Sequence, residues 1–340
     1  MITRYKSGGD LATLRIGIAG VGKLGRYHGQ NLLQIPAAEL VGVYDIAAER
    51  GIRVSEELGV QFYSSYDQLL KDVDAVSIAV PTRKHFELAS EALQMGRSVF
   101  VEKPITATIA EARTLVDLAN RQGLSLQVGH IERFNAAFRS LSTITLAPKF
   151  IEAHRLASFD PRGTDVAVVL DLMIHDIDLV LTLVHSPIRR IDANGVAVVS
   201  DNEDIANARI QFENGCVANL TASRISLKKM RKIRLFQPDM YLSLDLLLGQ
   251  AELYRLQAIA PEQIVQSPVS WGIIEKDGVR KQILYEKMQP EEENALKLEL
   301  QAFIEAVLNR NKTVVPGEDG LRALEVASLI LAEIKKSAGN

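Results

Sequence analysis

The fold is decided by the stretch Arg15-Ile16-Gly17-Ile18-Ala19-Gly20-Val21-Gly22-Lys23-Leu24-Gly25-Arg26. A short apolar run leads into three glycines spaced as G-x-G-x-x-G and then into a helical pattern. In such a turn, Gly20 permits the sharp bend, Gly22 lets the backbone approach a pyrophosphate, and Gly25 lets the helix pack on the strand. The first helical turn, with Lys23 and Leu24, points free N–H groups and the positive dipole end at the phosphates. The stretch therefore predicts a dinucleotide site.

A second strand, residues 39–45, ends in a carboxylate. Asp45 lies twenty residues after Gly25, the spacing expected for the acid that binds the adenosine ribose hydroxyls. A carboxylate there would repel a 2′-phosphate, so NAD is favoured over NADP, although Arg50 and Arg53 follow closely. The alternative for Asp45 is a helix N-cap before residues 46–48.

Length and composition describe an ordinary globular protein. The chain has 340 residues, 47% hydrophobic content and a formal net charge of −3, so we expect two domains and no binding of nucleic acid or an anionic membrane. The single cysteine, Cys216, excludes an internal disulfide, is expected in the core and suits a reducing compartment. The sequence shows no signal-peptide pattern and no uninterrupted apolar run of membrane-spanning length, so we expect a cytoplasmic protein.

Strands and helices alternate from residue 13 to about residue 148. After the first two strands, apolar runs predict strands at 73–80, 98–101 and 124–128, and helical patterns predict helices at 83–95, 107–122 and 131–142. Near-continuous apolar strands that alternate with helices form a parallel sheet covered on both faces. We therefore predict an α/β, doubly wound, dinucleotide-binding domain over residues 1–148.

The pattern changes after residue 148. A strand is predicted at 150–159, a helix at 166–184, and further strands at 205–213, 216–224, 233–237, 241–246 and 250–256, with Asn214-Gly215 as a hairpin turn. Helices at 291–309 and 319–336 close the chain. Residues 149–340 thus predict an α+β domain with a large, mainly antiparallel sheet. Ligands are expected at the carboxyl ends of the parallel strands, in the cleft between the domains.

Two groups of residues could carry chemistry. Glu102-Lys103-Pro104 leaves the end of a parallel strand, where Lys103 could stabilise an alkoxide as a hydride departs; the alternative is a solvated charged loop. A cis Lys103–Pro104 bond is also open.

Asp171 and His175 share one face of an apolar helix, with Asp178 one turn further on. A neighbouring carboxylate would orient the imidazole and raise its pKa, so His175 could take the hydroxyl proton during hydride transfer. The alternative is a satisfied core histidine. A metal site is not favoured because no third histidine or cysteine lies at ligand spacing.

Other polar residues are candidates for the same site. Pro81-Thr82 with His85 begins a helix after a strand, and Thr82 could equally be its N-cap. The substrate candidates, each with a structural alternative, are Arg133, Asn135, Arg155, Arg162 and Asp178. Arg224 is a further scattered cation that could contact a diphosphate.

These motifs together resemble a known family. The glycine motif, Asp45, Pro81-Thr82 with His85, Glu102-Lys103-Pro104 and Asp171-x-x-x-His175 occur in the order and spacing of the glucose–fructose oxidoreductase, inositol dehydrogenase and MocA (Gfo/Idh/MocA) family. The resemblance implies a Rossmann domain, a second domain with a large open sheet, NAD(P) and a cyclic polyol or sugar substrate. It also implies a catalytic group of Lys103, Asp171 and His175, cofactor contacts from the first three motifs and from Glu102 and Lys103, and a homodimer or homotetramer.

One subgroup looks more similar. Residues 130–135, 171–178 and 204–209 resemble the UDP-N-acetylglucosamine 3-dehydrogenases, which oxidise the sugar C3 hydroxyl to a ketone for a partner aminotransferase. This implies a role in amino-sugar synthesis for lipid A or another surface glycan. Two departures concern the substrate pocket: an apolar run, residues 166–170, replaces the glycine-rich run before Asp171, and Ala136 replaces a frequent proline. The alternatives are an inositol or free-sugar dehydrogenase and, from another class, a non-catalytic NAD-binding regulator.

Overall fold

The structure is a computed structural model that describes residues 12–160, 166–260, 270–276, 278–288 and 293–338. Its described residues form two compact units. The first takes in Met1–His130 and Leu296–Leu321, and the second Ile131–Ala295 and Arg322–Asn340. These units begin and end at other residues than the predicted domains 1–148 and 149–340.

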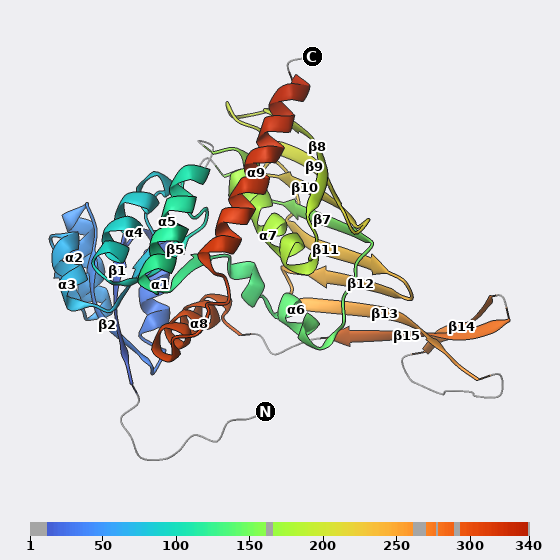
Figure 1. Ribbon diagram of the computed structural model, residues 1–340, viewed down its shortest axis with the longest axis horizontal. Helices are drawn as coiled ribbons and strands as arrows, with labels where there is room; N and C mark the ends of the chain where they lie inside the picture. Colours follow the sequence, from blue (N-terminus) through green and yellow to red (C-terminus); the bar gives the residue numbers. More distant parts are fainter. Residues whose placement is uncertain (1–11, 161–165, 261–269, 277, 289–292, 339–340) are drawn as a thin grey trace. The chain divides into compact units, whose positions relative to one another are not determined.

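The first unit contains a six-stranded sheet in the order β3-β2-β1-β4-β5-β6, with every neighbouring pair parallel (Figure 1). Its strands are β1 (Leu14–Ala19), β2 (Ala38–Tyr44), β3 (Gln61–Tyr63), β4 (Ala75–Ile78), β5 (Ser98–Glu102) and β6 (Leu126–Gly129). The strand order reverses between β1 and β4, and ligands bind at such a switch point in doubly wound sheets. The predicted Rossmann fold is confirmed.

Helices connect these strands. They are α1 (Lys23–Leu32), α2 (Ala48–Leu58), α3 (Tyr66–Asp72), α4 (His85–Gln94) and α5 (Ile109–Gln122). α5 begins at a capping box in which Thr108 and Glu111 satisfy each other's backbone N–H, and it ends at Gly123 with a φ of +65°. Glycine suits this left-handed position because it has no Cβ.

A helix from the far end of the sequence completes the first unit. α8 (Ala295–Asn309) places Phe303 in the core, with its ring centroid 5.9 Å from that of Phe100 on β5. Gln127 on β6 donates from Nε2 to the backbone oxygen of Glu299 at 3.1 Å. No local pattern in residues 295–309 indicates which sheet the helix will cover.

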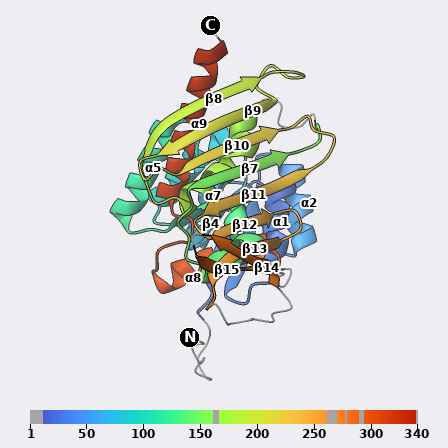
Figure 2. The ribbon, with the colours of Figure 1, turned by 90° about the vertical axis from the view of Figure 1, so that its right-hand side faces the viewer.

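The second unit contains a nine-stranded sheet in the order β14-β15-β13-β12-β11-β7-β10-β9-β8, which faces the viewer in Figure 2. Among the described residues, only β7 and β10 pair in parallel, and all other neighbours are antiparallel. Its strands are β7 (Phe150–Leu156), β8 (Ile188–Val196), β9 (Ile205–Phe212), β10 (Val217–Ser223), β11 (Met230–Gln237), β12 (Met240–Asp245), β13 (Gln250–Ala258), β14 (Ser270–Lys276) and β15 (Val279–Met288). The predicted large, mainly antiparallel sheet is confirmed.

One face of this sheet forms the core of the second unit. α7 (Ile174–Leu183) and α9 (Gly317–Ala338), the latter from Arg322 onward, pack their apolar residues against it. The strands alternate as predicted: alternate residues of β9 and β10 are buried, and Cys216 is fully buried beside them. The hairpin at Asn214-Gly215 is also confirmed, with a φ of +83° at Gly215.

The other face of the nine-stranded sheet carries a row of aromatic side chains. Neighbouring rings lie 4.9 to 5.7 Å apart across six strands. The row consists of Phe150, Phe236, Tyr241, Tyr254, Tyr285 and Trp271. Cross-strand aromatic pairs stabilise a sheet locally. The row also makes this face of the sheet less polar than the alternating residues of β9 and β10 predict.

Several elements differ from the predictions. The helix predicted at 131–142 is broken into a 3₁₀ turn (Ile131–Phe134), a short α6 (Ala136–Arg139) and a second 3₁₀ turn (Ser140–Thr143). The interruption has a cause at Asn135, whose backbone is extended: its Oδ1 accepts from Ala137 N and its Nδ2 donates to Leu246 O. Such side-chain bonds to the backbone compete with helix formation.

The helix predicted at 166–184 begins later, with a π-helical turn (Val169–Met173) that continues directly into α7. The first strand of the second unit ends at Leu156 rather than at residue 159, and the predicted strands omit β8, β14 and β15. Within the part of the chain that the structure describes, no helix is both long and apolar enough to cross a membrane.

Candidate functional site

The glycine turn has the geometry that the motif predicts. Gly20 has a φ of +86°, and a Cβ on Gly25 would lie 1.9 Å from the Gly20 carbonyl oxygen. Gly22, the N-cap residue of α1, differs: a Cβ there would meet no heavy atom within 4 Å. Two of the glycines are therefore required by the packing of the protein itself, whereas the space beside Gly22 suits an approaching ligand. Lys23 and Leu24, the first residues of α1, are exposed.

Asp45 connects the end of β2 to the glycine turn. Its Oδ2 accepts from Val21 N at 2.9 Å, and its Oδ1 accepts from Ala47 N at 2.8 Å. Arg50 adds two bonds, from Nε to Oδ2 at 2.9 Å and from Nη2 to Oδ1 at 2.6 Å. Burial raises the pKa of Asp45, but these hydrogen bonds outweigh burial and hold the pKa below its ordinary value. The carboxylate is therefore charged at neutral pH.

A cavity of about 380 Å³ opens beside this carboxylate, within the first unit. Its lining includes Gly20, Gly22 and Asp45 together with Pro81 from the turn after β4. These residues follow the carboxyl ends of β1, β2 and β4, where doubly wound sheets bind nucleotides. The residues present fit the adenosine and pyrophosphate portions of NAD.

His85 holds the turns after β4 and β5. Its Nδ1 lies 2.8 Å from Pro104 O, and its Nε2 lies 2.9 Å from Val80 O. Burial lowers the pKa of His85 despite these bonds, so the ring is neutral and donates to one of the two carbonyls at a time. Thr82 does not cap α4: it begins a 3₁₀ turn (Thr82–Lys84), and no side-chain capping bond forms there.

A buried histidine supports the turn that carries Lys103. His28 Nε2 lies 3.0 Å from Glu102 Oε1, and its Nδ1 lies 2.7 Å from Ser77 Oγ. Glu102 Oε2 in turn accepts from the backbone N–H of Lys103 at 3.3 Å. The Lys103–Pro104 bond is cis. Lys103 is half-buried at the carboxyl end of β5.

Asp171 and His175 lie in the second unit, where the π-helical turn passes into α7. Both side chains are half-buried, whereas Ile174, Asp176, Ile177 and Asp178 are buried. A π-helix has more residues per turn than an α-helix, and such single turns occur frequently at functional sites. The motif is thus presented by an irregular helix start rather than by the regular helix that its spacing predicts.

Two predicted substrate residues bind each other in the second unit. Arg133 donates from Nε to Asp178 Oδ2 at 2.8 Å and from Nη2 to Asp178 Oδ1 at 2.5 Å; the Asp178 side chain is buried, and the Arg133 side chain is 9% exposed. Asn135 bonds Leu246 O, Glu132 Oε2 and the start of α6. These contacts place the segment from Ile131 to Asn135 against α7.

Arg155 is also enclosed by partners. It donates from Nη1 to Glu132 Oε1 at 2.7 Å, and from Nε and Nη2 to the two Asp176 oxygens at 3.0 and 2.7 Å. The residue is 2% exposed. Arg231 Nη1 also contacts Glu132 Oε1, at 3.4 Å. The substrate roles predicted for Arg133, Asn135, Arg155 and Asp178 stay predictions.

Two further arginines complete the predicted set. Arg162 lies outside the described residues. Arg224 is buried and donates to the Val166 backbone oxygen.

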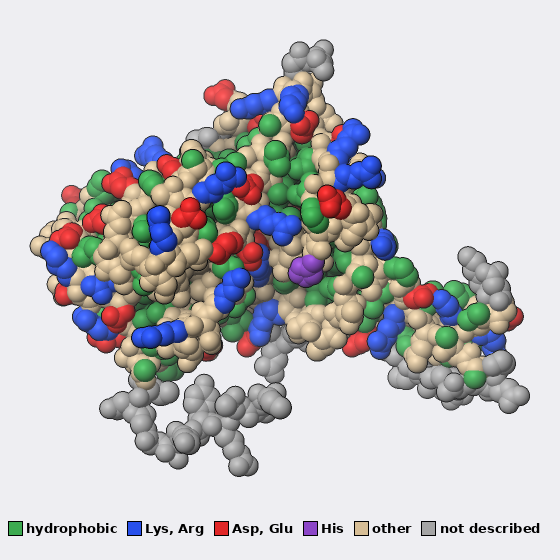
Figure 3. All heavy atoms as spheres, viewed as in Figure 1, with side chains coloured by type: hydrophobic (Ala, Val, Ile, Leu, Met, Phe, Trp, Pro, Cys, Tyr) green, Lys and Arg blue, Asp and Glu red, His purple; other side chains and the backbone are tan. Residues whose placement is uncertain are grey.

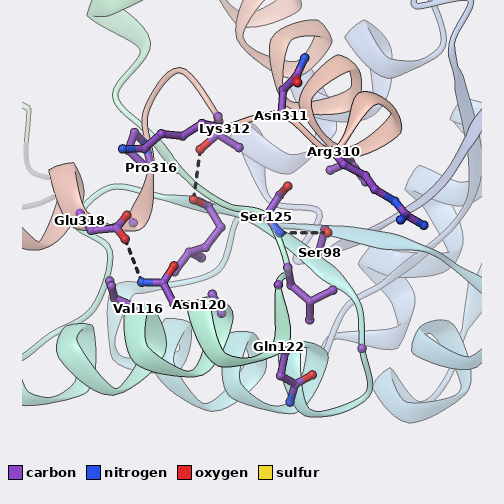
Figure 4. A pocket seen from close by; sticks show the side chains of 18 of the residues that line it. Ser98, Val116, Asn120, Gln122, Ser125, Arg310, Asn311, Lys312, Pro316 and Glu318 are labelled. Atoms are coloured by element: carbon purple, nitrogen blue, oxygen red, sulfur yellow. Dashed lines mark hydrogen bonds between the residues drawn. The ribbon is translucent and has the colours of Figure 1, made fainter.

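A larger cavity, of about 660 Å³, lies at the opposite ends of the parallel strands (Figure 4). Its lining includes Asp74, Ser98 and Ser125, which precede or begin β4, β5 and β6. Figure 4 shows that Glu318 binds Asn120 and that Ser98 binds Ser125 N, at 2.9 and 3.3 Å. This cavity lies at the amino ends of the strands and is separate from the predicted nucleotide site.

Charges of both signs are mixed on the face of the molecule that Figure 3 shows. On the face drawn in Figure 3, Lys and Arg side chains alternate with Asp and Glu side chains instead of forming a patch of one sign. Within the described ranges, no group of three or more His, Cys, Asp or Glu side chains could hold a metal ion.

Comparison with known proteins identifies the family. Residues 14–130 match the model of an oxidoreductase family with an NAD-binding Rossmann fold, and residues 127–237 match the Gfo/Idh/MocA C-terminal domain. A UDP-N-acetylglucosamine 3-dehydrogenase of Acidithiobacillus ferrooxidans is 38% identical over 315 residues, which cover 92% of this chain and 95% of that protein. The chain belongs to the Gfo/Idh/MocA oxidoreductase family.

Solved structures agree with this membership. A structure of the Acidithiobacillus enzyme superposes with a TM-score of 0.84 at 35% identity and covers 95% of this chain and 98% of that chain. A scyllo-inositol 2-dehydrogenase (NAD(+)) of Bacillus subtilis is 29% identical over 63% of this chain and 68% of that protein. A scyllo-inositol dehydrogenase from Lactobacillus casei with bound NAD(H) has a TM-score of 0.74 at 22% identity and shares the fold.

Family membership confirms three predictions: the chain is an oxidoreductase, it is a dehydrogenase that acts on a CH–OH group, and its cofactor is NAD. Sequence reasoning missed the partners that support the predicted residues. His28, Glu132 and Asp176 are buried and hold Glu102 or Arg155. Asp176 carried one available signal, because an acid on an apolar helix requires a partner.

Proposed function

We propose that the chain catalyses NAD-dependent oxidation of the C3 hydroxyl of UDP-N-acetylglucosamine to a ketone. The observation that carries this proposal is the 38% identity to an enzyme of that name over nearly the full length of both chains. The inositol dehydrogenase of Bacillus subtilis is less similar, over a shorter part of the chain. Bound NAD would accept the hydride from the sugar carbon.

Lys103 is the proposed donor to the substrate hydroxyl. Its ammonium would stabilise negative charge on the oxygen as the hydride departs, and such electrostatic groups contribute roughly 10²–10³-fold in rate. The turn that carries Lys103 is held by the Ser77–His28–Glu102 contacts and by His85. This support favours a fixed position for the ammonium over a solvated loop.

His175 is the proposed base that receives the hydroxyl proton, and Asp171 is the residue proposed to orient it. Both are half-buried where the π-helical turn passes into α7, beside the buried Ile174 and Asp176. Two ion pairs, Asp176 with Arg155 and Asp178 with Arg133, hold α7, the helix that carries His175. Proton transfer by a positioned histidine contributes roughly 10²–10⁴-fold in rate.

A substrate panel tests the proposal. The pure protein is mixed with NAD⁺ and either UDP-N-acetylglucosamine, N-acetylglucosamine, glucose or inositol, with a carbonyl trap to draw the equilibrium forward, and reduced nicotinamide is followed by absorbance. We expect signal with the UDP-sugar alone. Signal with inositol or a free sugar would instead establish the alternative dehydrogenases, and NAD⁺ binding without signal from any substrate would favour the non-catalytic regulator.

Three further assignments accompany the proposal. The ketone product is a substrate for an aminotransferase that makes a 3-amino sugar, as in surface-glycan or lipid A synthesis. A homodimer or homotetramer is proposed through the aromatic row of the nine-stranded sheet, on which Trp271 is 67% exposed. A cytoplasmic location is proposed because the one cysteine, Cys216, is a buried free thiol, which suits a reducing compartment.

A further inference from the structure

The acceptor capacity of Asp45 is fully used by the protein itself. A carboxylate offers about four lone-pair directions, and Asp45 receives two backbone N–H groups and two N–H groups of Arg50. Ribose hydroxyls that donate to the same oxygens must therefore displace a donor.

Of the donors, only Arg50 is free to move. Val21 N and Ala47 N are fixed by the backbone on either side of the carboxylate. The Asp45 side chain is 3% exposed, whereas the Arg50 side chain is 43% exposed. Ile46 and Arg50 both line the 380 Å³ cavity together with Asp45, so a displaced guanidinium stays beside the adenosine site.

We propose that Arg50 sets the cofactor preference of this enzyme: it competes with the ribose of NAD for Asp45, and it holds the 2′-phosphate of NADP. A guanidinium carries five N–H donors, and Arg50 uses two of them on Asp45. The others can bind phosphate oxygens while the positive charge shields the phosphate from the carboxylate. NAD thus loses affinity through Arg50, and NADP gains affinity through the same residue.

Three other charged side chains lie at this cavity. Arg83, Lys84 and Glu87 also line it. Lys84 is paired with Glu87 at 2.7 Å. Arg83 is exposed and is the rival ligand for a 2′-phosphate.

Calorimetric titration with NAD⁺ and NADP⁺, without any sugar, tests the proposal independently of the substrate assignment. In Arg50→Ala we expect NAD⁺ to bind about twofold to fivefold more tightly, because the half-exposed guanidinium that competes for Asp45 is lost. NADP⁺ should bind roughly tenfold more weakly, because charge-assisted bonds to phosphate are lost. Arg50→Lys keeps the positive charge but not the planar set of guanidinium donors, so its affinity for NADP⁺ should lie between those of the wild type and Arg50→Ala.

Arg53→Ala is the matched control, since Arg53 is exposed one turn along and does not line the cavity. It should leave the ratio of the two dissociation constants unchanged. The proposal is overturned if Arg50→Ala weakens or does not change NAD⁺ binding. It is also overturned if Arg83→Ala, and not Arg50→Ala, abolishes the affinity for NADP⁺.

Discussion

Arg133 and Asp178 form a largely buried, two-point ion pair, with N–O distances of 2.8 and 2.5 Å. The pair joins the 3₁₀ turn at Ile131–Phe134 to α7, three residues after His175. A fork-to-fork bond of this kind fixes orientation as well as distance. The helix that carries the proposed base is therefore anchored by residues that do not belong to the proposed catalytic group.

Loss of one partner of this pair should destabilise the second unit. Asp178→Ala removes the carboxylate that pairs with the largely buried Arg133 charge, which costs about 3 kcal/mol of the free energy of unfolding. Urea titration followed by circular dichroism measures the loss. The control is Asp67→Ala, because Asp67 pairs with Lys71 at 2.5 Å with both side chains at least half exposed, and such pairs contribute less than about 1 kcal/mol. Equal losses in the two variants would contradict this account.

The glycine turn offers two substitutions with different expected outcomes. Gly25→Ala should destabilise the protein without cofactor, because its Cβ would overlap the Gly20 carbonyl oxygen. Gly22→Ala should change the melting temperature little but weaken NAD⁺ binding roughly tenfold or more, because the methyl group occupies space for the pyrophosphate. Thermal melts and calorimetric titration measure the two effects. Unchanged NAD⁺ affinity in Gly22→Ala would show that the pyrophosphate does not bind beside Gly22.

The fold was largely predictable because its signals are local. Apolar runs, capping residues and the glycines at 20, 123 and 215 act within a few positions of themselves. The break at Asn135 was not predictable, because its cause includes a bond to Leu246 O, 111 positions away. The position of α8 was not predictable either, because its contact with Phe100 depends on packing between residues far apart in the sequence.

Asp204 should stabilise the second unit in a pH-dependent manner. Burial raises its pKa, but the N–H groups of Val199 and Val198 and the backbone and hydroxyl of Ser200 bind the carboxylate and hold the pKa well below its ordinary value. A lowered pKa means that the unfolded chain binds the proton more readily than the folded protein does.

The stabilisation by Asp204 is therefore complete above the unfolded pKa of about 3.9 and decreases as the pH falls toward the folded pKa. Asp204→Asn should be less stable than the wild type at pH 7 by about 2 kcal/mol, and this difference should shrink below about pH 4. Urea titrations across the acid range measure it. A difference that stays constant below that pH would show that the charge of Asp204 does not contribute.

Lys103→Ala and His175→Ala should each lower kcat by roughly 10²–10⁴-fold with little change in NAD⁺ affinity. Lys71→Ala and His185→Ala are the controls, since both side chains are exposed. Steady-state kinetics and calorimetric titration separate the two effects. Retention of full turnover in either catalytic variant would refute its proposed role.

The site was less predictable than the fold. Lys103, Asp171 and His175 could be proposed because their motifs have characteristic spacing, and their catalytic roles stay predictions. The partners of Arg133 and Arg155 could not, because Asp178 and Asp176 lie 45 and 21 positions away. A lone arginine in a sequence fits a phosphate and a buried carboxylate equally well, and only the folded chain distinguishes the two.

Transfer of an isotopic label tests the central claim most directly. UDP-N-acetylglucosamine deuterated at C3 is incubated with the protein and NAD⁺, and the reduced cofactor is analysed by mass spectrometry beside a sample deuterated at C4. The account predicts deuterium in the reduced nicotinamide from the C3-labelled sugar only, with slower turnover of that substrate. Label from C4, or unlabelled reduced nicotinamide from both sugars, would contradict oxidation at C3.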